Sequence, residues 1–149
     1  MYSNILVSTD GSEFADKAVR EAATLAKELG SRLVLFYAVP HYEMPHLAEG
    51  MSAPNYPRDK EEVQRVMEAE ARRILAHSAR NVTVAGVAVE QQFTVNHSPY
   101  EAIIEAAQKF KCELIVMASH GRRGLSGVVL GSETQKVLTH STIPVLVVR

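Results

Sequence analysis

The residues most able to do chemistry in this chain lie in a glycine-rich run from Gly121 to Ser132. Four glycines in this run allow the backbone to approach a ligand closely, because they carry no side chain. The run leads directly into a predicted helix over 132–140, whose free N–H groups and positive dipole end attract anions. Ser132 adds a hydroxyl donor, and Arg122 and Arg123 add positive charge. These features predict a phosphate site.

The same run also has a purely structural interpretation. The glycines then form a flexible loop, and Ser132 caps the following helix, with Gln135 completing a Ser-x-x-Gln capping box. The run is not a P-loop, because no lysine follows Gly131, and it does not match the dinucleotide fingerprint. The glycines alone therefore leave phosphate binding and a structural loop equally open.

A carboxylate stands where the first apolar run ends, in the segment Thr9-Asp10-Gly11-Ser12. A carboxylate at the end of a parallel strand can accept hydrogen bonds from the hydroxyls of a ribose. The alternative is that Asp10 is an ordinary turn residue in front of a helix. Because the segment lacks the G-x-G-x-x-G pattern, NAD and FAD are disfavoured as ligands.

Histidine and cysteine offer other chemistry, but their spacing argues against it. His41 and His46 lie five residues apart in a proline-interrupted segment without zinc-type spacing, so we expect no metal site. Ser119 and His120 lack the G-x-S-x-G of a nucleophile elbow, so we expect no serine triad and no catalytic residue. Cys112 is interpreted as a small buried apolar residue, although the lysine beside it would favour a reactive thiolate.

Alternating strand and helix patterns must position these segments. Short apolar runs predict strands at 4–8, 32–39, 113–118 and 143–148, with a further strand inside 82–94. Apolar residues at three- and four-residue spacing predict helices over 12–29, 58–80, 98–111 and 132–140. Ser12 is the predicted N-cap of the first helix, and Ser98-Pro99-Tyr100-Glu101 begins the third. A long loop is expected over 40–57.

This alternation predicts one α/β domain over residues 1–149. The expected architecture is a doubly wound, Rossmann-like, five-stranded parallel sheet of order 3-2-1-4-5, with helices on both faces. Ligands of such sheets bind beyond the carboxyl ends of the strands, at the point where the strand order reverses. The segments after the strands at 4–8, 32–39 and 113–118 meet at that edge, and these segments hold the candidate residues.

The composition limits the class of protein. The chain has 149 residues, of which 46% are hydrophobic, one cysteine, and a formal net charge of −1. A chain of this size buries about 68–70% of its unfolded surface, so it needs no disulfide or structural metal. The balanced charge argues against nucleic acid and membrane surfaces as partners, and no apolar stretch reaches the roughly 18 residues of a membrane helix. We therefore expect a cytoplasmic protein.

Several of these segments together resemble the universal stress protein family. The similarity spans the chain and lies in Val7-Ser-Thr-Asp10-Gly-Ser12, Tyr37-Ala-Val39, Ile115-Val-Met-Ala-Ser-His-Gly121, Leu130-Gly-Ser132 and Pro144-Val-Leu-Val-Val148. ATP-binding members carry G-x-x-G, nine residues and then G-S or G-T, and the second half of that pattern fits this chain. The resemblance implies ATP as the ligand, with or without Mg²⁺.

The resemblance also implies roles for individual residues. Asp10 would hold the ribose, Val39 would meet the adenine through its backbone, and Gly121, Gly131 and Ser132 would surround the phosphates. Further contacts implied in the same way are Thr9, Met117, Ala118, His120, Arg122 and Glu133. The chain departs from the family pattern at Ala118, where a glycine is expected, and at Glu133, where an apolar residue is common. A methyl group at 118 would crowd the nucleotide, and a carboxylate at 133 would repel a phosphate unless it turned to solvent.

The first functional hypothesis is a homodimeric, ATP-binding stress-response protein whose output is its nucleotide state, with at most slow hydrolysis. The second is a dimeric interaction protein of the same fold that does not bind nucleotide, marked by Ala118 and Glu133. An enzyme that uses adenine nucleotides is the least favoured. The dimer is expected through the C-terminal edge strand around Val145–Val148, and the alternative is a monomer whose edge is guarded by Pro144 and Arg149.

Overall fold

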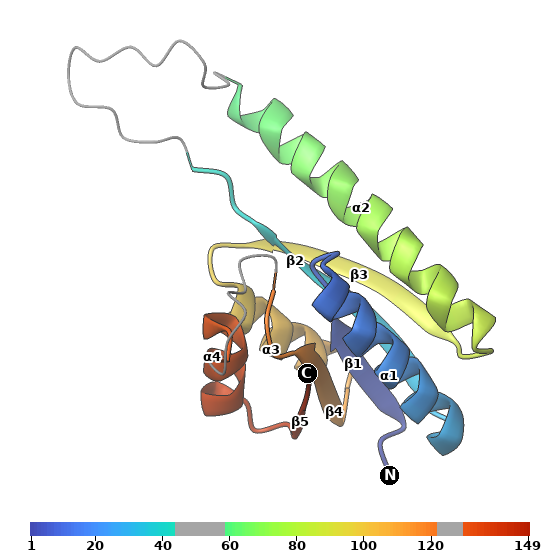
Figure 1. Ribbon diagram of the computed structural model, residues 1–149. Helices are drawn as coiled ribbons and strands as arrows, with labels where there is room; N and C mark the ends of the chain where they lie inside the picture. The colour runs from blue at the N-terminus through green and yellow to red at the C-terminus, as the bar shows by residue number, and fades with distance from the viewer. Residues whose placement is uncertain (44–58, 122–129) are drawn as a thin grey trace, which may run out of the picture.

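Strands and helices alternate along the chain (Figure 1). The computed structural model describes residues 1–43, 59–121 and 130–149. The strands within these residues are β1 Asn4–Ser8, β2 Arg32–Pro40, β3 Val89–Asn96, β4 Leu114–Ala118 and β5 Val145–Val148. The helices are α1 Glu13–Leu29, α2 Lys60–Val84, α3 Pro99–Lys109 and α4 Ser132–His140. Most of the loop expected over 40–57 lies outside the described residues, and Pro40 is the last residue of β2.

The sheet is parallel throughout and has the order β3-β2-β1-β4-β5, which confirms the predicted topology. β1 and β4 are neighbours at its centre, although α1, β2, α2, β3 and α3 separate them in the sequence. From β1 the chain moves outward to β2 on one side, and it later returns to β4 on the other. The strand order therefore reverses between β1 and β4, and this is where a doubly wound sheet binds its ligand.

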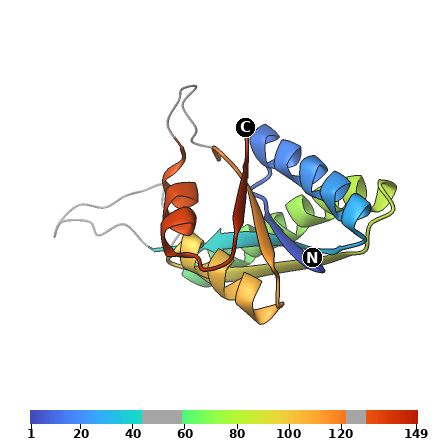
Figure 2. The ribbon, with the colours of Figure 1, turned by 90° about the horizontal axis from the view of Figure 1, so that it is seen from below.

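Helices cover both faces of the sheet (Figure 2): α1 and α2 pack on one face, α3 and α4 on the other. The buried side of α1 is almost entirely alanine, which lets the helix approach the strands closely. Ser12 caps its start as predicted, since the Ser12 hydroxyl oxygen accepts a hydrogen bond from the Ala15 N–H at 3.2 Å. Gly30 ends it in a left-handed conformation with φ of 68°. No helix in the described segments is both long enough and apolar enough to span a bilayer.

Phe36 is the principal aromatic side chain of the core on the α3 side of the sheet. It is the largest of the fully buried side chains in the described residues, with 1% of its surface exposed. Around it lie apolar side chains from β1, β2, β4, α3 and α4, among them Leu6, Val34, Ile103, Ile115, Met117 and Val137. The Phe36 carbonyl oxygen also accepts a hydrogen bond from the Thr9 N–H at 2.9 Å. The core residue is thereby tied to the turn that leaves β1.

α2 is longer than the sequence pattern predicts. It continues to Val84 instead of ending near residue 80, so the strand expected within 82–94 begins only at Val89. The added turn carries Val82, which is fully buried in the same core cluster as Leu75. Packing of Val82 therefore outweighs the weak helix propensity of the asparagine, valine and threonine residues in this turn. The other predicted bounds shift by one or two residues.

Cys112 is buried just before β4. Burial raises the pKa of its thiol to about 11, and the negative charge of Glu90 adds to this shift. The thiol is therefore protonated at neutral pH, and a protonated thiol is a poor nucleophile. This confirms the interpretation of Cys112 as a small buried apolar residue.

Candidate functional site

The carboxyl ends of β1 and β4 bring together the segments that the sequence analysis singled out. Residues 9–12 follow β1, and residues 119–121 follow β4. Since β1 and β4 are paired neighbours, these two exits emerge side by side at one edge of the sheet. The chain returns to the same edge at Gly131, which directly precedes α4.

The turn after β1 is built by its own side chains. The Gly11 N–H donates to Thr9 Oγ1 at 3.2 Å, and the Ser12 N–H donates to Asp10 Oδ1 at 3.0 Å. Gly11 has a φ of 77°, a conformation that favours glycine. Asp10 is therefore a turn residue, as the structural alternative proposed, and its Oδ1 serves this turn. The turn fixes the direction in which the second oxygen points.

That second oxygen lies against the backbone of Gly121. A Cβ added at Gly121 would be 2.7 Å from Asp10 Oδ2, which is closer than real Cβ contacts come. Asp10 and Gly121 are far apart in the sequence, and the pairing of β1 with β4 places them in contact. The glycine-rich run thus begins at the predicted ribose-binding carboxylate.

Two hydrogen bonds hold the far end of the glycine-rich run against the end of β4. The Gly131 N–H donates to the Ser119 carbonyl oxygen at 2.7 Å, and Thr134 Oγ1 donates to the Ala118 carbonyl oxygen at 3.0 Å. A Cβ at Gly131 would lie 3.2 Å from the Ser119 oxygen, so a glycine suits this close approach. Both ends of the glycine-rich run therefore lie beside the carboxyl end of β4. Arg122, a predicted contact, lies outside the described residues.

The N-terminus of α4 carries no side-chain cap from the described residues. Gly131 is the N-cap residue, and no side chain within residues 1–43, 59–121 and 130–149 accepts a hydrogen bond from the first turn. The predicted capping box is therefore wrong: Ser132 is the first helical residue, and Gln135 Nε2 donates instead to the Leu130 carbonyl oxygen at 3.1 Å. The first N–H groups of a helix have no partner within the helix, so this end suits an anion.

The direction of the β2 backbone adds a residue that the sequence analysis missed. The Leu33 N–H donates to the carbonyl oxygen of Ala88, just before β3, and the His41 N–H donates to that of Asn96 in β3, whereas the Phe36 carbonyl oxygen accepts from Thr9 beside β1. Backbone groups alternate in direction along a strand, so those of Val39 face β3 and those of Ala38 face the side of β1. β1 ends at Ser8, before it could pair with Ala38. The alternating direction of backbone groups along β2 could have identified Ala38 before the structure was known.

Comparison with known proteins identifies the family of the chain. A family model described as the universal stress protein family matches residues 1–149, which is the whole chain. The chain belongs to the universal stress protein family. A curated universal stress protein of Thermus aquaticus is 34% identical over 152 residues, which cover 100% of this chain and 100% of that protein.

Solved structures of universal stress proteins share the fold. One from Burkholderia pseudomallei is 29% identical, with a TM-score of 0.76 over 99% of this chain and 96% of that chain. Another, described as a universal stress protein in complex with cAMP, is 25% identical, with a TM-score of 0.70 over 99% of this chain and 97% of that chain.

In this universal stress protein, Ala118 and Met117 face away from the crevice. The Met117 side chain is buried in the core on the α3 side, and Ala118 belongs to the core on the α1 side. Ala118 is 9% exposed, so its methyl group packs inward. The departure from the family glycine at this position therefore places little bulk where a ligand would bind.

His120 lies between β4 and the start of α1. Its Nδ1 is 2.9 Å from Ser119 Oγ, and its ring centroid is 5.7 Å from that of Phe14. Its buried Nε2 has no hydrogen-bond partner within the described segments. No carboxylate therefore orients His120 there, and Ser119 is 2% exposed. Within the described residues, Ser119 and His120 therefore have no third group that would complete a serine triad.

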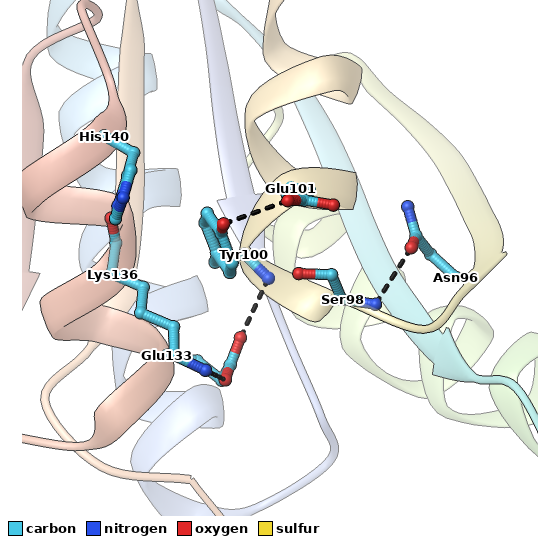
Figure 3. A network of polar contacts seen from close by, with 7 residues as sticks. All are labelled: Asn96, Ser98, Tyr100, Glu101, Glu133, Lys136 and His140. Carbon is cyan, nitrogen blue, oxygen red and sulfur yellow. Dashed lines mark hydrogen bonds and ion pairs between the residues drawn. The ribbon is translucent and has the colours of Figure 1, made fainter.

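The Glu133 side chain turns away from the start of its own helix and caps α3 (Figure 3). Glu133 Oε2 accepts a hydrogen bond from the Tyr100 N–H at 2.9 Å, and Oε1 pairs with Lys136 Nζ at 2.9 Å. The predicted capping residue of α3, Ser98, makes no side-chain cap. Glu133 was expected to turn to solvent. It instead accepts a hydrogen bond at the start of α3, and this contact keeps its carboxylate on the α3 side.

Replacing Glu133 with alanine is expected to lower the free energy of unfolding by about 1 kcal/mol, because the start of α3 loses its cap. Glu133→Gln is the matched control, since its amide oxygen can still accept the hydrogen bond from Tyr100, and we expect a smaller loss. Urea denaturation of both variants measures the difference. Equal stability of Glu133→Ala and the parent protein would show that the contact does not stabilise α3.

Proposed function

We propose that this protein binds adenine nucleotides, ATP above all, in the crevice at the carboxyl ends of β1 and β4. The observation that carries the proposal is the close approach of Asp10 Oδ2 to Gly121, where an added Cβ would lie 2.7 Å from that oxygen, beside a start of α4 that no described side chain caps. A carboxylate suited to ribose hydroxyls and a helix end suited to phosphates therefore lie at one edge of the sheet. The relative in complex with cAMP supports the same class of ligand.

Each part of the nucleotide has a proposed partner. Asp10 accepts hydrogen bonds from the ribose, and the backbone of Ala38 meets the adenine edge in place of Val39, whose backbone groups face β3. Gly121, Gly131 and Ser132 surround the phosphates, with Mg²⁺ accompanying ATP. The proposed lining is completed by Thr9, His120 and Arg122, whereas the side chains of Met117 and Ala118 pack into the core on either face of the sheet. Glu133 acts on this site only indirectly, through the packing of α3 against α4.

The proposed output is the occupancy of the site, in a cytoplasmic stress-response protein that acts as a nucleotide-dependent regulator. The turn after β1 is fixed by a hydrogen bond from the Ser12 N–H to Asp10 Oδ1, and the far end of the run is fixed by a main-chain hydrogen bond from Gly131 to Ser119, so both segments are preorganised for a ligand. Binding of a nucleotide stabilises the folded state in proportion to its affinity and concentration. Hydrolysis, if any, is expected to be slow compared with binding and release.

Calorimetric titration tests this function on protein freed of copurified nucleotide. We expect saturable binding of ATP at one site per chain, and weaker binding of adenosine, which lacks the phosphates. Ala118→Gly should bind ATP with nearly the affinity of the parent protein, because the Ala118 methyl packs into the core. Absence of saturable binding by the parent, or a large gain in Ala118→Gly, would instead support the interaction protein that has lost nucleotide binding.

We further propose a homodimer through β5, the outer strand beside β4. The carbonyl oxygens of Pro144 and Val148 accept hydrogen bonds from β4, so the backbone groups of Val147 point to the open edge. Unpaired strand edges favour pairing with a second copy. Val147→Pro removes an outward N–H and should give monomers, whereas Val147→Thr keeps that N–H and should stay dimeric. Light scattering after size exclusion measures the mass, and a dimeric Val147→Pro would contradict this interface.

A further inference from the structure

Three side chains that can bind a metal ion meet beyond the ends of β2 and β3. His41 and Glu43 follow β2, and His97 follows β3. Because Pro40 pairs with Asn96 at the end of the parallel ladder, the chain leaves both strands at the same place. One nitrogen or oxygen atom from each of the three side chains lies within 4.8 Å of the others.

The contacts within this histidine cluster, made of His41, Glu43 and His97, are close. His97 Nδ1 is 3.1 Å from Glu43 Oε1, and the centroids of the two imidazole rings are 4.1 Å apart. Ligand atoms around a tetrahedral zinc ion, at bonds of about 2.0 Å, are separated by roughly 3.3 Å. The His97 and Glu43 atoms already have this separation. The third ligand atom needs an approach of at most about 1.5 Å, which rotation of the exposed Glu43 and His97 side chains can supply.

Polar atoms beside the cluster lack partners. His41 Nδ1, Tyr42 Oη and Gln64 Nε2 are buried and have no hydrogen-bond partner in residues 1–43, 59–121 and 130–149. Buried polar atoms are rarely left in this state. His41, Tyr42, Glu43 and His97 line one cavity of about 540 Å³. The surroundings of the cluster are therefore polar and large enough to hold an ion with its water.

We propose that His41, Glu43 and His97 bind a divalent transition-metal ion, with Zn²⁺ as the favoured ion. Two imidazoles and one carboxylate form a ligand set that zinc uses in proteins, and three protein ligands leave a fourth position for water. Bound zinc would join the exit of β2 to the exit of β3. The segments it joins adjoin the adenine-binding backbone proposed at Ala38.

The spacing of the histidines does not indicate this site, because His97 is remote from His41 along the chain and forms no recognisable metal spacing with it. The inference is also independent of the proposed nucleotide function. The cluster belongs to the ends of β2 and β3, whereas the ribose and phosphate contacts belong to β1, β4 and α4. Each proposal can therefore fail without the other.

Calorimetric titration with ZnCl₂ tests the proposal on the full chain, after removal of any histidine tag and treatment with a chelator. We expect one zinc ion per chain, and an affinity at least about tenfold lower in His41→Ala and His97→Ala, because each loses a ligand. Glu43→Gln should also bind zinc more weakly, since the amide is a poorer ligand than the carboxylate. His77→Ala is the matched control, because His77 is exposed on α2 and outside the cluster.

A second measurement separates loss of the metal from loss of the fold. Zinc should raise the melting temperature of the parent protein and of His77→Ala, but not that of His41→Ala or His97→Ala. The melting temperatures without metal should agree among these proteins, since the histidine cluster lies outside the core. Unchanged zinc affinity in both cluster variants, or an equal loss in His77→Ala, would overturn the assignment. ATP titration of His97→Ala should match that of the parent.

Discussion

Gly121→Ala is expected to weaken the binding of ATP by roughly 100-fold, which corresponds to about 2.7 kcal/mol. The new Cβ would lie 2.7 Å from Asp10 Oδ2, so the carboxylate has to leave its place. Hydrogen bonds to a charged group contribute about 1.5–3 kcal/mol, and the displaced Asp10 would lose those it makes with the ribose. Calorimetric titration of the variant against the parent protein measures the effect.

The stability of Gly121→Ala should change by less than about 1 kcal/mol. Gly121 does not have a positive φ, and the atom that must move is the end of a side chain. Gly86→Ala provides the opposite control. Gly86 has a φ of 81° with no atom within 4 Å of an added Cβ, so alanine there is strained but meets nothing. We expect Gly86→Ala to lose stability and keep its ATP affinity, and the reverse pattern would refute the assigned role of Gly121.

Phe36→Ala is expected to lower the free energy of unfolding by about 3–5 kcal/mol, the range for removing a buried aromatic ring. Phe36 is 1% exposed and fills the core between β2 and α3, so the variant leaves a cavity. Small domains are stable by only about 5–15 kcal/mol, and this loss is therefore a large share of the total. Urea denaturation, monitored by circular dichroism, gives the difference.

Phe14→Ala is the matched control, because it makes the same chemical change at a side chain that is 45% exposed. We expect a loss below about 1 kcal/mol there. Phe36→Leu should lie between the two, since leucine fills part of the space. Equal losses in Phe36→Ala and Phe14→Ala would mean that the core around Phe36 contributes little to stability.

The centre of the sheet could be predicted from the sequence because β1, β2 and β4 are largely buried on both faces. Such strands appear as uninterrupted apolar runs, and the runs at β1, β2 and β4 are bounded by turn residues or proline. The helices between them then require parallel pairing. The end of α2 was less predictable, because burial of Val82 decides whether the last turn stays helical. Local propensity does not contain that information.

The contacts of the site depend on distances between segments, and these were only partly predictable. That Asp10 would lie near Gly121 followed from the order of strands, since both follow central strands. The capping of α3 by Glu133 could not be foreseen, because it depends on how α3 and α4 pack together. The histidine cluster is a similar case, since the ends of β2 and β3 bring His41 and His97 into contact.

Arg149 lies beyond the carboxyl ends of the strands, where the proposed ligand also binds. Val148 pairs with Ala118, and the Arg149 backbone oxygen accepts a hydrogen bond from Lys17 Nζ on α1. Met1 precedes β1 and therefore lies at the amino ends of the strands, on the opposite side of the sheet from the ligand. A fluorescent label or affinity tag attached after Arg149 would lie beside the opening of the proposed nucleotide site. It would therefore either report nucleotide binding or hinder it. The same attachment before Met1 would leave that opening free.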